Sequence, residues 1–461
     1  MEAKWRSGRL PLMPMMLLFF IILCGKFQGC FSEVWNKRKS APPAATKRFG
    51  SSVVLPITGN VYPLGYYYVT VNIGNPPKLY ELDIDTGSDL TWVQCDAPCV
   101  RCTKPRDSLY KPKGNLVPCQ HSLCAAIQAP ETRHCKSPTD QCDYEVDYAD
   151  TGSSSGVLVA DILPLRLSNG SVIGPRLAFG CGYDQKNPGP GPAAPTAGVL
   201  GLGNGKVGLV SQMYAMGVTQ NVMGHCLSGQ GGGFIFIGEY LFPPSGIVWT
   251  PMTTLKEFYS SGPTELFFGG KPSGLKGLQV IFDSGSSYTY FNSEAYKTML
   301  NLIRQDIKGK PLKDAPEDKT LPVCWKGGKP FKSIRDVSGY FKPMALSFTN
   351  AKNVQLQLPP EAYLIVTEKG NVCLGILNGT EIDLGNLNIL GDISLQDKMV
   401  IYDNGKQQIG WVSTDCNRLP NLDRDYGEDF SPPIGILEGH CPAQCASKKA
   451  NMQTCRGRSE A

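Results

Sequence analysis

The feature that most constrains this fold is an internal repeat. Residues 85–92 read Asp-Thr-Gly-Ser-Asp-Leu-Thr-Trp and residues 283–290 read Asp-Ser-Gly-Ser-Ser-Tyr-Thr-Tyr, so an Asp, a hydroxyl residue, a Gly, a Ser, a Thr and an aromatic residue fall in register. Farther along, Gly-Val-Leu-Gly at 198–201 matches Asn-Ile-Leu-Gly at 388–391, and each Asp precedes the Leu of its second motif by 115 and 107 residues. Two matches in the same order at nearly equal spacing indicate a duplicated lobe.

Most of the remaining chain carries β-strand patterns. Alternating or β-branched runs bounded by Gly and Pro predict strands at 66–73, 156–167, 233–237 and 398–402. The best helical spacing covers 293–308, with Ser293 placed as the N-cap. We therefore predict an all-β protein of two pseudo-twofold-related lobes, 51–250 and 251–416, with few short helices and a cleft between the lobes.

The N-terminus differs in composition from the rest of the chain. Basic residues at 1–9 precede an apolar run at 10–24, which is typical of a secretory signal peptide, predicted here at 1–29. An uncut signal anchor is the alternative. Residues 30–50 are basic and predict a short prosegment, with a solvated charge run as the alternative. Beyond this region no run approaches the ~20 apolar residues of a membrane span, so we expect none in the mature chain.

Charge and secretion narrow the class of protein. Residues 1–50 hold nine Lys or Arg and two acidic residues, a net charge of +7. Because the whole chain has a net charge of +5, the remaining residues have a net charge of −2, which argues against a nucleic-acid partner. The Asn-x-Ser/Thr motifs at Asn169 and Asn378 predict N-glycosylation. We expect a protein of the secretory pathway, either extracellular (apoplastic) or vacuolar.

The 17 cysteines are expected to form disulfides in that oxidising compartment. Two groups have spacing that also permits zinc, but the export signal and the lack of suitably spaced histidines argue against a metal site. These groups are Cys99, Cys102, Cys119 with Cys124, and His440, Cys441 with Cys445. Residues 417–461 hold three cysteines and are predicted to be a separate C-terminal extension.

The repeated Asp loops predict a chemical site. Pseudo-twofold symmetry would bring Asp85 and Asp283 face to face, and two adjacent carboxylates cannot both ionise readily, so the pair would hold one proton at acidic pH. One carboxylate would then activate a water and the other would hydrogen bond a substrate carbonyl, with no cofactor. The residues expected to orient them are Thr86, Gly87, Ser88, Ser284, Gly285 and Ser286. The alternative is a pair of structural turn aspartates.

These motifs resemble those of the pepsin-type aspartic endopeptidases, and among them the plant nucellin-like group. The resemblance rests on the run 85–99, with further support at 59–65, 197–203, 283–286 and 389–411, and it covers about 51–416. It implies a bilobal pepsin-like fold whose cleft holds an extended polypeptide. It also implies a secreted hydrolase, made as a zymogen and expected to be a monomer, that cleaves peptide bonds at acidic pH.

The same resemblance assigns a flap and some disulfides. Tyr148 would close over the substrate from a hairpin around 149–155, and Trp92 would be its hydrogen-bonding partner. Residues 95–142 resemble a cysteine-rich insertion. The resemblance implies a Cys324–Cys373 bridge in the second lobe. For a bridge to the C-terminal strand, Cys181 with Cys416 is our guess, since connectivity does not follow from sequence.

Two other functions are considered. A catalytically inactive relative, such as the plant xylanase inhibitors, would keep the fold and cysteine pattern and bind glycosidases. Catalytic loss usually shows as a damaged Asp loop or a missing flap Tyr, whereas both Asp loops and Tyr148 are intact here. A glycosidase using the two aspartates is the third option, but nothing in the sequence favours a sugar cleft. The sequence thus predicts an aspartic-type endopeptidase.

Overall fold

The computed structural model describes residues 52–129, 135–186, 195–239, 241, 246–253 and 258–418. All of these belong to one compact unit. The predicted signal peptide, the prosegment and all but the first two residues of the 417–461 extension lie outside the described residues. Within them, no helix combines the length and apolar character needed to cross a bilayer.

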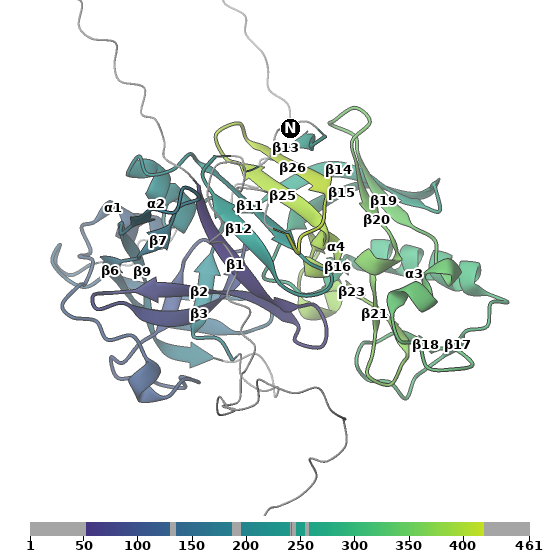
Figure 1. Cartoon of the computed structure of the whole chain (residues 1–461), viewed down its shortest axis with the longest axis horizontal. Coiled ribbons are helices and arrows are strands. Elements are labelled where there is room, and N and C mark those ends of the chain that lie inside the picture. The colour runs from purple at the N-terminus through teal and green to yellow at the C-terminus, as the bar shows by residue number, and fades with distance from the viewer. Residues whose placement is uncertain are drawn as a thin grey trace, which may run out of the picture. The chain divides into compact units, whose positions relative to one another are not determined.

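The larger of two main sheets has 13 strands, and it contains strands from both ends of the chain. Its order is β13-β26-β25-β11-β12-β1-β2-β3-β10-β4-β9-β6-β5. The strands are β1 (Val53–Asn60), β2 (Tyr66–Ile73), β3 (Lys78–Asp85), β4 (Trp92–Gln94), β5 (Asp143–Asp147), β6 (Ser153–Ile162), β9 (Arg176–Lys186), β10 (Gly198–Gly201), β11 (Val222–Leu227), β12 (Gly233–Ile237), β13 (Val248–Pro251), β25 (Lys398–Asp403) and β26 (Gln408–Ser413). Figure 1 shows the yellow C-terminal strand β25 lying beside β11, with β26 on the other side of β25. The C-terminal strands therefore complete a sheet that the N-terminal half begins.

The second main sheet has seven strands, in the order β20-β19-β14-β15-β24-β16-β23. They are β14 (Ser260–Phe268), β15 (Lys271–Phe282), β16 (Thr289–Phe291), β19 (Met344–Phe348), β20 (Gln355–Leu358), β23 (Ile376–Asn378) and β24 (Asn388–Leu390). Smaller sheets comprise β17 (Lys313–Asp314), β18 (Cys324–Lys326), β21 (Leu364–Val366) and β22 (Val372–Leu374), and the pair β7 (Leu165–Arg166) and β8 (Val172–Ile173). Apolar side chains of both main sheets share one hydrophobic core, including Leu82 and Phe282.

Helices are short in the described residues. The α-helices are α1 (Ser122–Ile127), α2 (Leu209–Ala215), α3 (Ser293–Ile307) and α4 (Asp392–Leu395), and the 3-10 helices are η1 (Arg106–Ser108), η2 (Ile334–Asp336), η3 (Ser338–Tyr340), η4 (Pro360–Ala362) and η5 (Gly379–Ile382). The all-β prediction with few helices is confirmed. The limits of the two predicted lobes stay a prediction.

Several local predictions can be compared with the structure. The predicted strands at 66–73, 233–237 and 398–402 correspond to β2, β12 and β25. The run predicted at 156–167 instead breaks around Pro164, between β6 and β7, because proline lacks the amide that a strand ladder needs. The predicted helix is α3, but its N-cap is Asn292 rather than Ser293, since the Asn292 side chain accepts a hydrogen bond from the Ala295 amide (3.0 Å).

The internal repeat is also a repeat of topology. In the first half, β10 runs parallel to β3 and antiparallel to β4. In the second half, β24 runs parallel to β15 and antiparallel to β16. In each three-strand unit, the Asp loop follows an outer strand, β3 or β15, and the apolar motif forms the central strand, β10 or β24. The same three-strand unit therefore presents both Asp loops.

Six disulfides join described cysteines: Cys95–Cys181, Cys99–Cys102, Cys119–Cys135, Cys124–Cys142, Cys226–Cys416 and Cys324–Cys373. The Cys324–Cys373 pairing agrees with the expectation. The guess of Cys181 with Cys416 was wrong. Cys181 lies on β9, which runs parallel to β4, and Cys95 comes directly after β4, so these two cysteines pair (Cα–Cα 5.3 Å). Cys416 instead pairs with Cys226 on β11 (Cα–Cα 5.2 Å).

Candidate active site

The two Asp loops meet where the repeated units approach each other. A Cβ atom at Gly87 would lie 2.6 Å from Asp283 Oδ1, and one at Gly285 would collide with Asp85 Oδ1. Each glycine therefore allows the opposite carboxylate to approach its backbone closely. The structure thus brings Asp85 and Asp283 together, as the symmetry argument predicts.

Both carboxylates are oriented by the same pair of hydrogen bonds. The Gly87 amide donates to Asp85 Oδ1 (2.7 Å) and the Ser88 hydroxyl donates to Asp85 Oδ2 (2.5 Å). Asp283 receives equivalent bonds from the backbone amide two residues on (2.9 Å) and from the Ser286 hydroxyl (2.7 Å). These are the contacts that the sequence analysis expects of the glycine and serine positions.

The residues after the two aspartates lock the loops to each other. The Thr86 hydroxyl accepts from the Ser284 amide (2.9 Å) and donates to the Phe282 carbonyl (2.9 Å). In return, Ser284 Oγ accepts from the Thr86 amide (3.1 Å) and donates to the Ile84 carbonyl (3.3 Å). Because these bonds are reciprocal and buried, they fix the position of one carboxylate relative to the other.

Burial and charge alter the acidity of this site. Burial first, and the charge of Asp283 second, raise the pKa of Asp85 above its usual value, although the Ser88 and Gly87 hydrogen bonds oppose the shift. The raised pKa favours one proton on the pair in the acidic range. The pair therefore has the acid–base property that water activation requires.

Two further acids near the site, the buried Asp392 and the half-buried Asp83, were missed by the sequence analysis. Asp392, the first residue of α4, is buried, and burial with the charges of Asp283 and Asp85 raises its pKa well above the usual value. Burial also raises the pKa of Asp83 to about 7. The sequence holds one signal for Asp392: the residue after the apolar motif is Leu202 in the first half and an aspartate in the second, so the repeat changes from an apolar to an acidic residue there.

A hairpin covers the Asp85 side of the site. Strands β5 and β6 pair antiparallel, with Asp147 opposite Ser153, and Tyr148 begins the connecting turn. Trp92 Nε1 donates to the Tyr148 hydroxyl at 2.6 Å. Burial and the negative charge of Asp85 raise the pKa of Tyr148, which places the phenol near the carboxylate. Tyr148 and Trp92 thus have the geometry expected for a flap.

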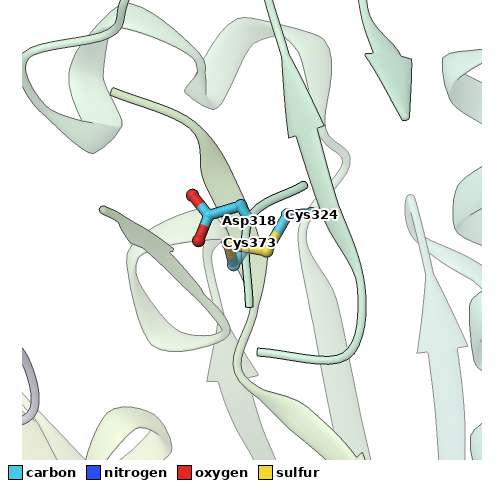
Figure 2. A group of neighbouring side chains, drawn as sticks. All are labelled: Asp318, Cys324 and Cys373. Atoms are coloured by element: carbon cyan, nitrogen blue, oxygen red, sulfur yellow. A yellow bond between two sulfur atoms is a disulfide. The ribbon is translucent and has the colours of Figure 1, made fainter. Parts of the chain in front are cut away.

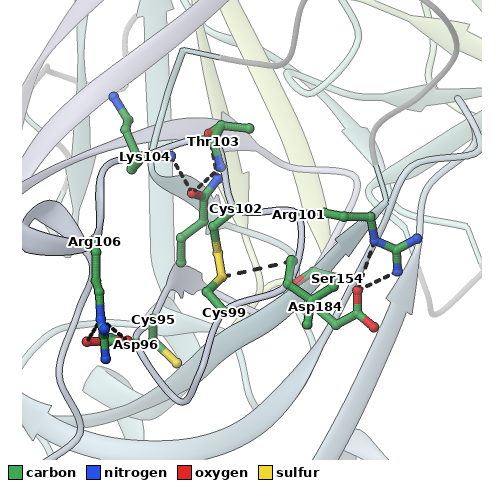
Figure 3. Close-up of a disulfide and its surroundings, with 12 residues drawn as sticks. Cys95, Asp96, Cys99, Arg101, Cys102, Thr103, Lys104, Arg106, Ser154 and Asp184 are labelled. Carbon is green, nitrogen blue, oxygen red and sulfur yellow. Dashed lines mark hydrogen bonds and ion pairs between the residues drawn. A yellow bond between two sulfur atoms is a disulfide. The ribbon is translucent and has the colours of Figure 1, made fainter.

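The start of the cysteine-rich insertion is fastened to the strand that carries Trp92. Figure 3 shows the Cys99–Cys102 disulfide in a loop whose next two amides, those of Thr103 and Lys104, donate to Gln94 Oε1 (2.9 and 3.0 Å). In the same loop Arg106 contacts Asp96 and Arg101 contacts Asp184. All four cysteines of the zinc-like group are engaged in disulfides, so none of them is free to act as a thiolate ligand.

A second cysteine group also fails as a metal site. Asp318, Cys324 and Cys373 lie together, but Figure 2 shows the two sulfurs bonded to each other, so neither is a thiolate ligand. The Asp318 carboxylate accepts hydrogen bonds from Thr367 (2.7 Å) and Asn371 (2.9 Å). This carboxylate therefore has a structural role beside the disulfide.

The two candidate glycosylation sites differ in their surroundings. Asn169 is exposed, and its Oδ1 accepts from the amide (3.0 Å) and hydroxyl (2.7 Å) of Ser171. Asn378 is half-buried at the end of β23, and its Nδ2 donates to Glu381 (2.8 Å). Asn169 is therefore the better placed of the two to carry a glycan.

Comparison with known proteins places these features in a family. A model described as the xylanase inhibitor N-terminal domain matches residues 67–239, and one described as the xylanase inhibitor C-terminal domain matches 271–413. The chain is 44% identical over 383 residues to a protein of Oryza sativa subsp. japonica that is named as an aspartic proteinase, covering 80% of this chain and 92% of that one.

Solved structures show the same fold. The basic 7S globulin from soybean aligns with a TM-score of 0.62 at 17% identity, covering 81% of this chain and 99% of that one. The aspartic proteinase from Irpex lacteus aligns with a TM-score of 0.56 at 16% identity, covering 80% and 99%.

Proposed function

This chain belongs to the xylanase-inhibitor-type family of pepsin-like aspartic proteinases, and from that premise we propose that it is an active aspartic endopeptidase. The observation that carries the proposal is the pair Asp85 and Asp283, held together by reciprocal loop contacts and oriented by matching serine and glycine bonds. An inactive binding protein would have no need to keep this arrangement. Burial and the charge of Asp283 raise the pKa of Asp85, which supports retention of one proton by the pair at acidic pH.

The mechanism follows from a dyad that holds one proton. A water between the carboxylates gives a proton to the ionised one and attacks the scissile carbonyl carbon, while the protonated carboxyl hydrogen bonds the carbonyl oxygen. The tetrahedral intermediate then collapses as a proton passes to the leaving amine, so no acyl-enzyme forms. The shared proton belongs to the pair rather than to either residue.

The flap supplies the substrate side of this proposal. Tyr148 lies near Asp85 and is held by Trp92, so it would close over an extended polypeptide bound across the dyad. We further propose that the enzyme is a secreted or vacuolar monomer, activated by removal of the basic residues at 30–50.

An inactive inhibitor-like function is the second candidate. It is favoured by the two matching family models, both described as xylanase inhibitor domains. In that case the protein would bind a glycosidase and cleave nothing.

The test is cleavage of a denatured protein by the purified mature chain at about pH 4. We expect cleavage that a pepstatin-type transition-state mimic blocks, and a loss of at least about 1,000-fold in Asp283→Asn, because removing a group central to water activation forfeits most of the catalysis. Asp314→Asn, at an exposed acid on β17, is the matched control and should cleave normally.

Two outcomes would contradict the proposal. Comparable turnover by Asp283→Asn would remove the dyad mechanism. A folded wild-type protein that cleaves nothing but inhibits a xylanase would establish the second candidate instead.

A further inference from the structure

One acidic residue shares a strand face with Asp85 but belongs to neither Asp loop. Asp83 precedes Asp85 by two residues on β3, so both side chains leave the same face of the sheet, about 7 Å apart along the strand. Asp83 pairs with Val199 on β10, and Val199 pairs in turn with Trp92 on β4. Val199 and the flap residue Tyr148 pack in one apolar cluster with Trp92. Asp83 therefore lies one strand away from a residue that the flap packs against.

The internal repeat shows that the fold does not require an acid at this position. In the second half, the residue two positions before Asp283 is Ile281. It pairs with Ile389 on β24, in the register that Asp83 keeps with β10. Ile281 is buried, whereas Asp83 is half-buried. Because an apolar residue meets the structural requirement, a carboxyl next to the site carries a desolvation cost that packing does not return.

The Asp83 carboxylate makes fewer hydrogen bonds than it can accept. Its Oδ2 accepts from the Thr196 hydroxyl (2.7 Å), while its Oδ1 is shielded from solvent and has no donor within the described part of the chain. An ionised carboxylate can accept about four hydrogen bonds. Because the terminal torsion of an aspartate is broad, this group can turn to meet a donor that a bound polypeptide brings.

The surroundings of Asp83 favour a cation over a neutral donor. Glu81, two residues earlier on the same strand face, forms an ion pair with Lys104 (3.5 Å), so the charge of that lysine is already shared. Tyr68 is the direct partner of Asp83 on β2, and its ring lies 6.0 Å from that of Tyr66. Carboxylates and aromatic faces together are the groups that attract an ammonium or a guanidinium.

We propose that Asp83 is a specificity-determining residue that binds a lysine or arginine side chain of the substrate polypeptide. Each residue of an extended chain covers about 3.3 Å, so a cation held about 7 Å from Asp85 belongs to a residue within three of the scissile bond. The inference rests on the proposed function, because it names the substrate class of the same site.

Binding of the cation should also displace a proton. Burial raises the pKa of Asp83 to about 7 against the opposing effects of Thr196 and Lys104, so this carboxyl is protonated at acidic pH in the free protein. An adjacent ammonium favours the ionised form, so the proton passes to solvent as the cation binds. The preference for a cation should therefore grow as pH rises from about 4 to about 6. The other ionisable groups near Asp83 are Tyr66, Tyr68, Glu81, Asp85, Lys104 and Asp392.

Peptides that differ at a single position test the proposal. The series carries one lysine, or the uncharged norleucine, at each of the three positions on either side of the scissile bond. At one of these positions, at about pH 6, we expect the wild type to cleave the lysine peptide with a kcat/KM at least about 10-fold above that of its norleucine counterpart, the order of a charge-assisted hydrogen bond. The ratio should be smaller at about pH 4. Equal kcat/KM at every position would overturn the proposal.

Variants separate the role of Asp83 from that of negative charge in general. Asp83→Asn keeps the shape and an acceptor for Thr196, and should reduce the ratio of lysine to norleucine kcat/KM to less than about 2. Glu81→Gln removes the neighbouring acid of the same strand face and should leave that ratio unchanged. If Asp83→Asn folds poorly, Asp83→Ile replaces it, because it copies the residue at the matching position of the second half. An unaltered lysine preference in the folded Asp83 variant would contradict the assignment.

A binding measurement keeps this inference separate from the proposed function. Calorimetry with uncleavable analogues, in which a transition-state mimic replaces the scissile bond, requires no turnover. In buffers of different ionisation heat at about pH 6, the lysine analogue should bind more tightly than the norleucine analogue and release about one proton. Equal affinities, or binding of neither analogue, would overturn the inference. Preferential binding of the lysine analogue without cleavage of any peptide would refute only the endopeptidase function.

Discussion

At the scale of residues, the site depends on small groups as much as on the two acids. Gly87 leaves room for the opposite carboxylate, and Ser88 and Ser286 orient the outer oxygens. These roles could be predicted from the repeat, because each position recurs beside its own Asp. Asp392 could not be predicted in the same way, because the repeat has Leu202 at the matching position, and the rise in the Asp392 pKa comes from burial and from the charges of Asp283 and Asp85, which only the folded structure brings together.

Replacing Gly87 should disrupt the dyad. A Cβ atom there would lie 2.6 Å from Asp283 Oδ1, so the carboxylate must move. We expect Gly87→Ala to lower kcat by at least about 100-fold, the order of loss that an ångström of misplacement causes. Gly339→Ala, where a Cβ atom meets nothing within 4 Å, is the control and should keep normal kinetics. Normal turnover in Gly87→Ala would mean that the carboxylates need not be so close.

The flap hydroxyl makes a second prediction at this scale. Tyr148→Phe removes the bond from Trp92 Nε1 (2.6 Å) and should lower kcat/KM about 10-fold, the value of one well-formed hydrogen bond. Tyr68→Phe, at a half-buried tyrosine on β2, should leave kcat/KM unchanged. Steady-state kinetics on a peptide substrate would measure both, and equal values would show that the hydroxyl has no part in flap closure.

At the scale of elements, features set by local sequence patterns can be predicted from the sequence, whereas contacts between distant segments cannot. The helix α3 could be predicted, because its spacing lies within the segment itself, and the hairpin of β5 and β6 was implied by the family resemblance together with its local turn residues. The pairing of β11 with β25 could not, since it joins strands far apart in the chain across the symmetry axis. The disulfide guess failed for that reason: Cys416 follows β26, and the sheet brings it to Cys226.

The two kinds of disulfide should differ in their effect on stability. The Cys226–Cys416 bridge closes a separation of 190 residues, whereas Cys99–Cys102 closes one of three. We expect the double change Cys226→Ser with Cys416→Ser to reduce the free energy of unfolding by about 2–4 kcal/mol, because a long loop regains most entropy in the unfolded chain. Cys99→Ser with Cys102→Ser should reduce it by clearly less. Urea unfolding would measure both, and an inverted order would contradict this account.

At the scale of the whole molecule, buried acids should make stability depend on pH. Asp83, Asp85 and Asp392 have raised pKa values in the folded protein, so their stabilisation is complete below their unfolded pKa near 4. That contribution is lost as pH rises through the pKa values of the folded protein, of which that of Asp83 is about 7. His225 acts in the opposite sense, because its folded pKa of about 3 removes stability as pH falls from about 6.5.

Between about pH 4 and pH 7, the stability lost by the three carboxyls as pH rises exceeds the stability gained by the one imidazole. We therefore expect the Tm of the mature protein to be higher at about pH 5 than at about pH 7.5. Asp392→Asn should reduce this difference, and Asp314→Asn should not. Thermal unfolding followed by circular dichroism would measure both, and a Tm that rises towards neutral pH would contradict the assignment of buried protonated acids.

The central claim is that the two halves of the molecule place Asp85 and Asp283 so that they hold one proton together. Neutron diffraction from crystals of the mature protein at about pD 5 would test it most directly. The account predicts a single deuterium on the pair and one water within hydrogen-bonding distance of both carboxyls. Two ionised carboxylates, two fully protonated ones, or oxygens too far apart to share that water would contradict it.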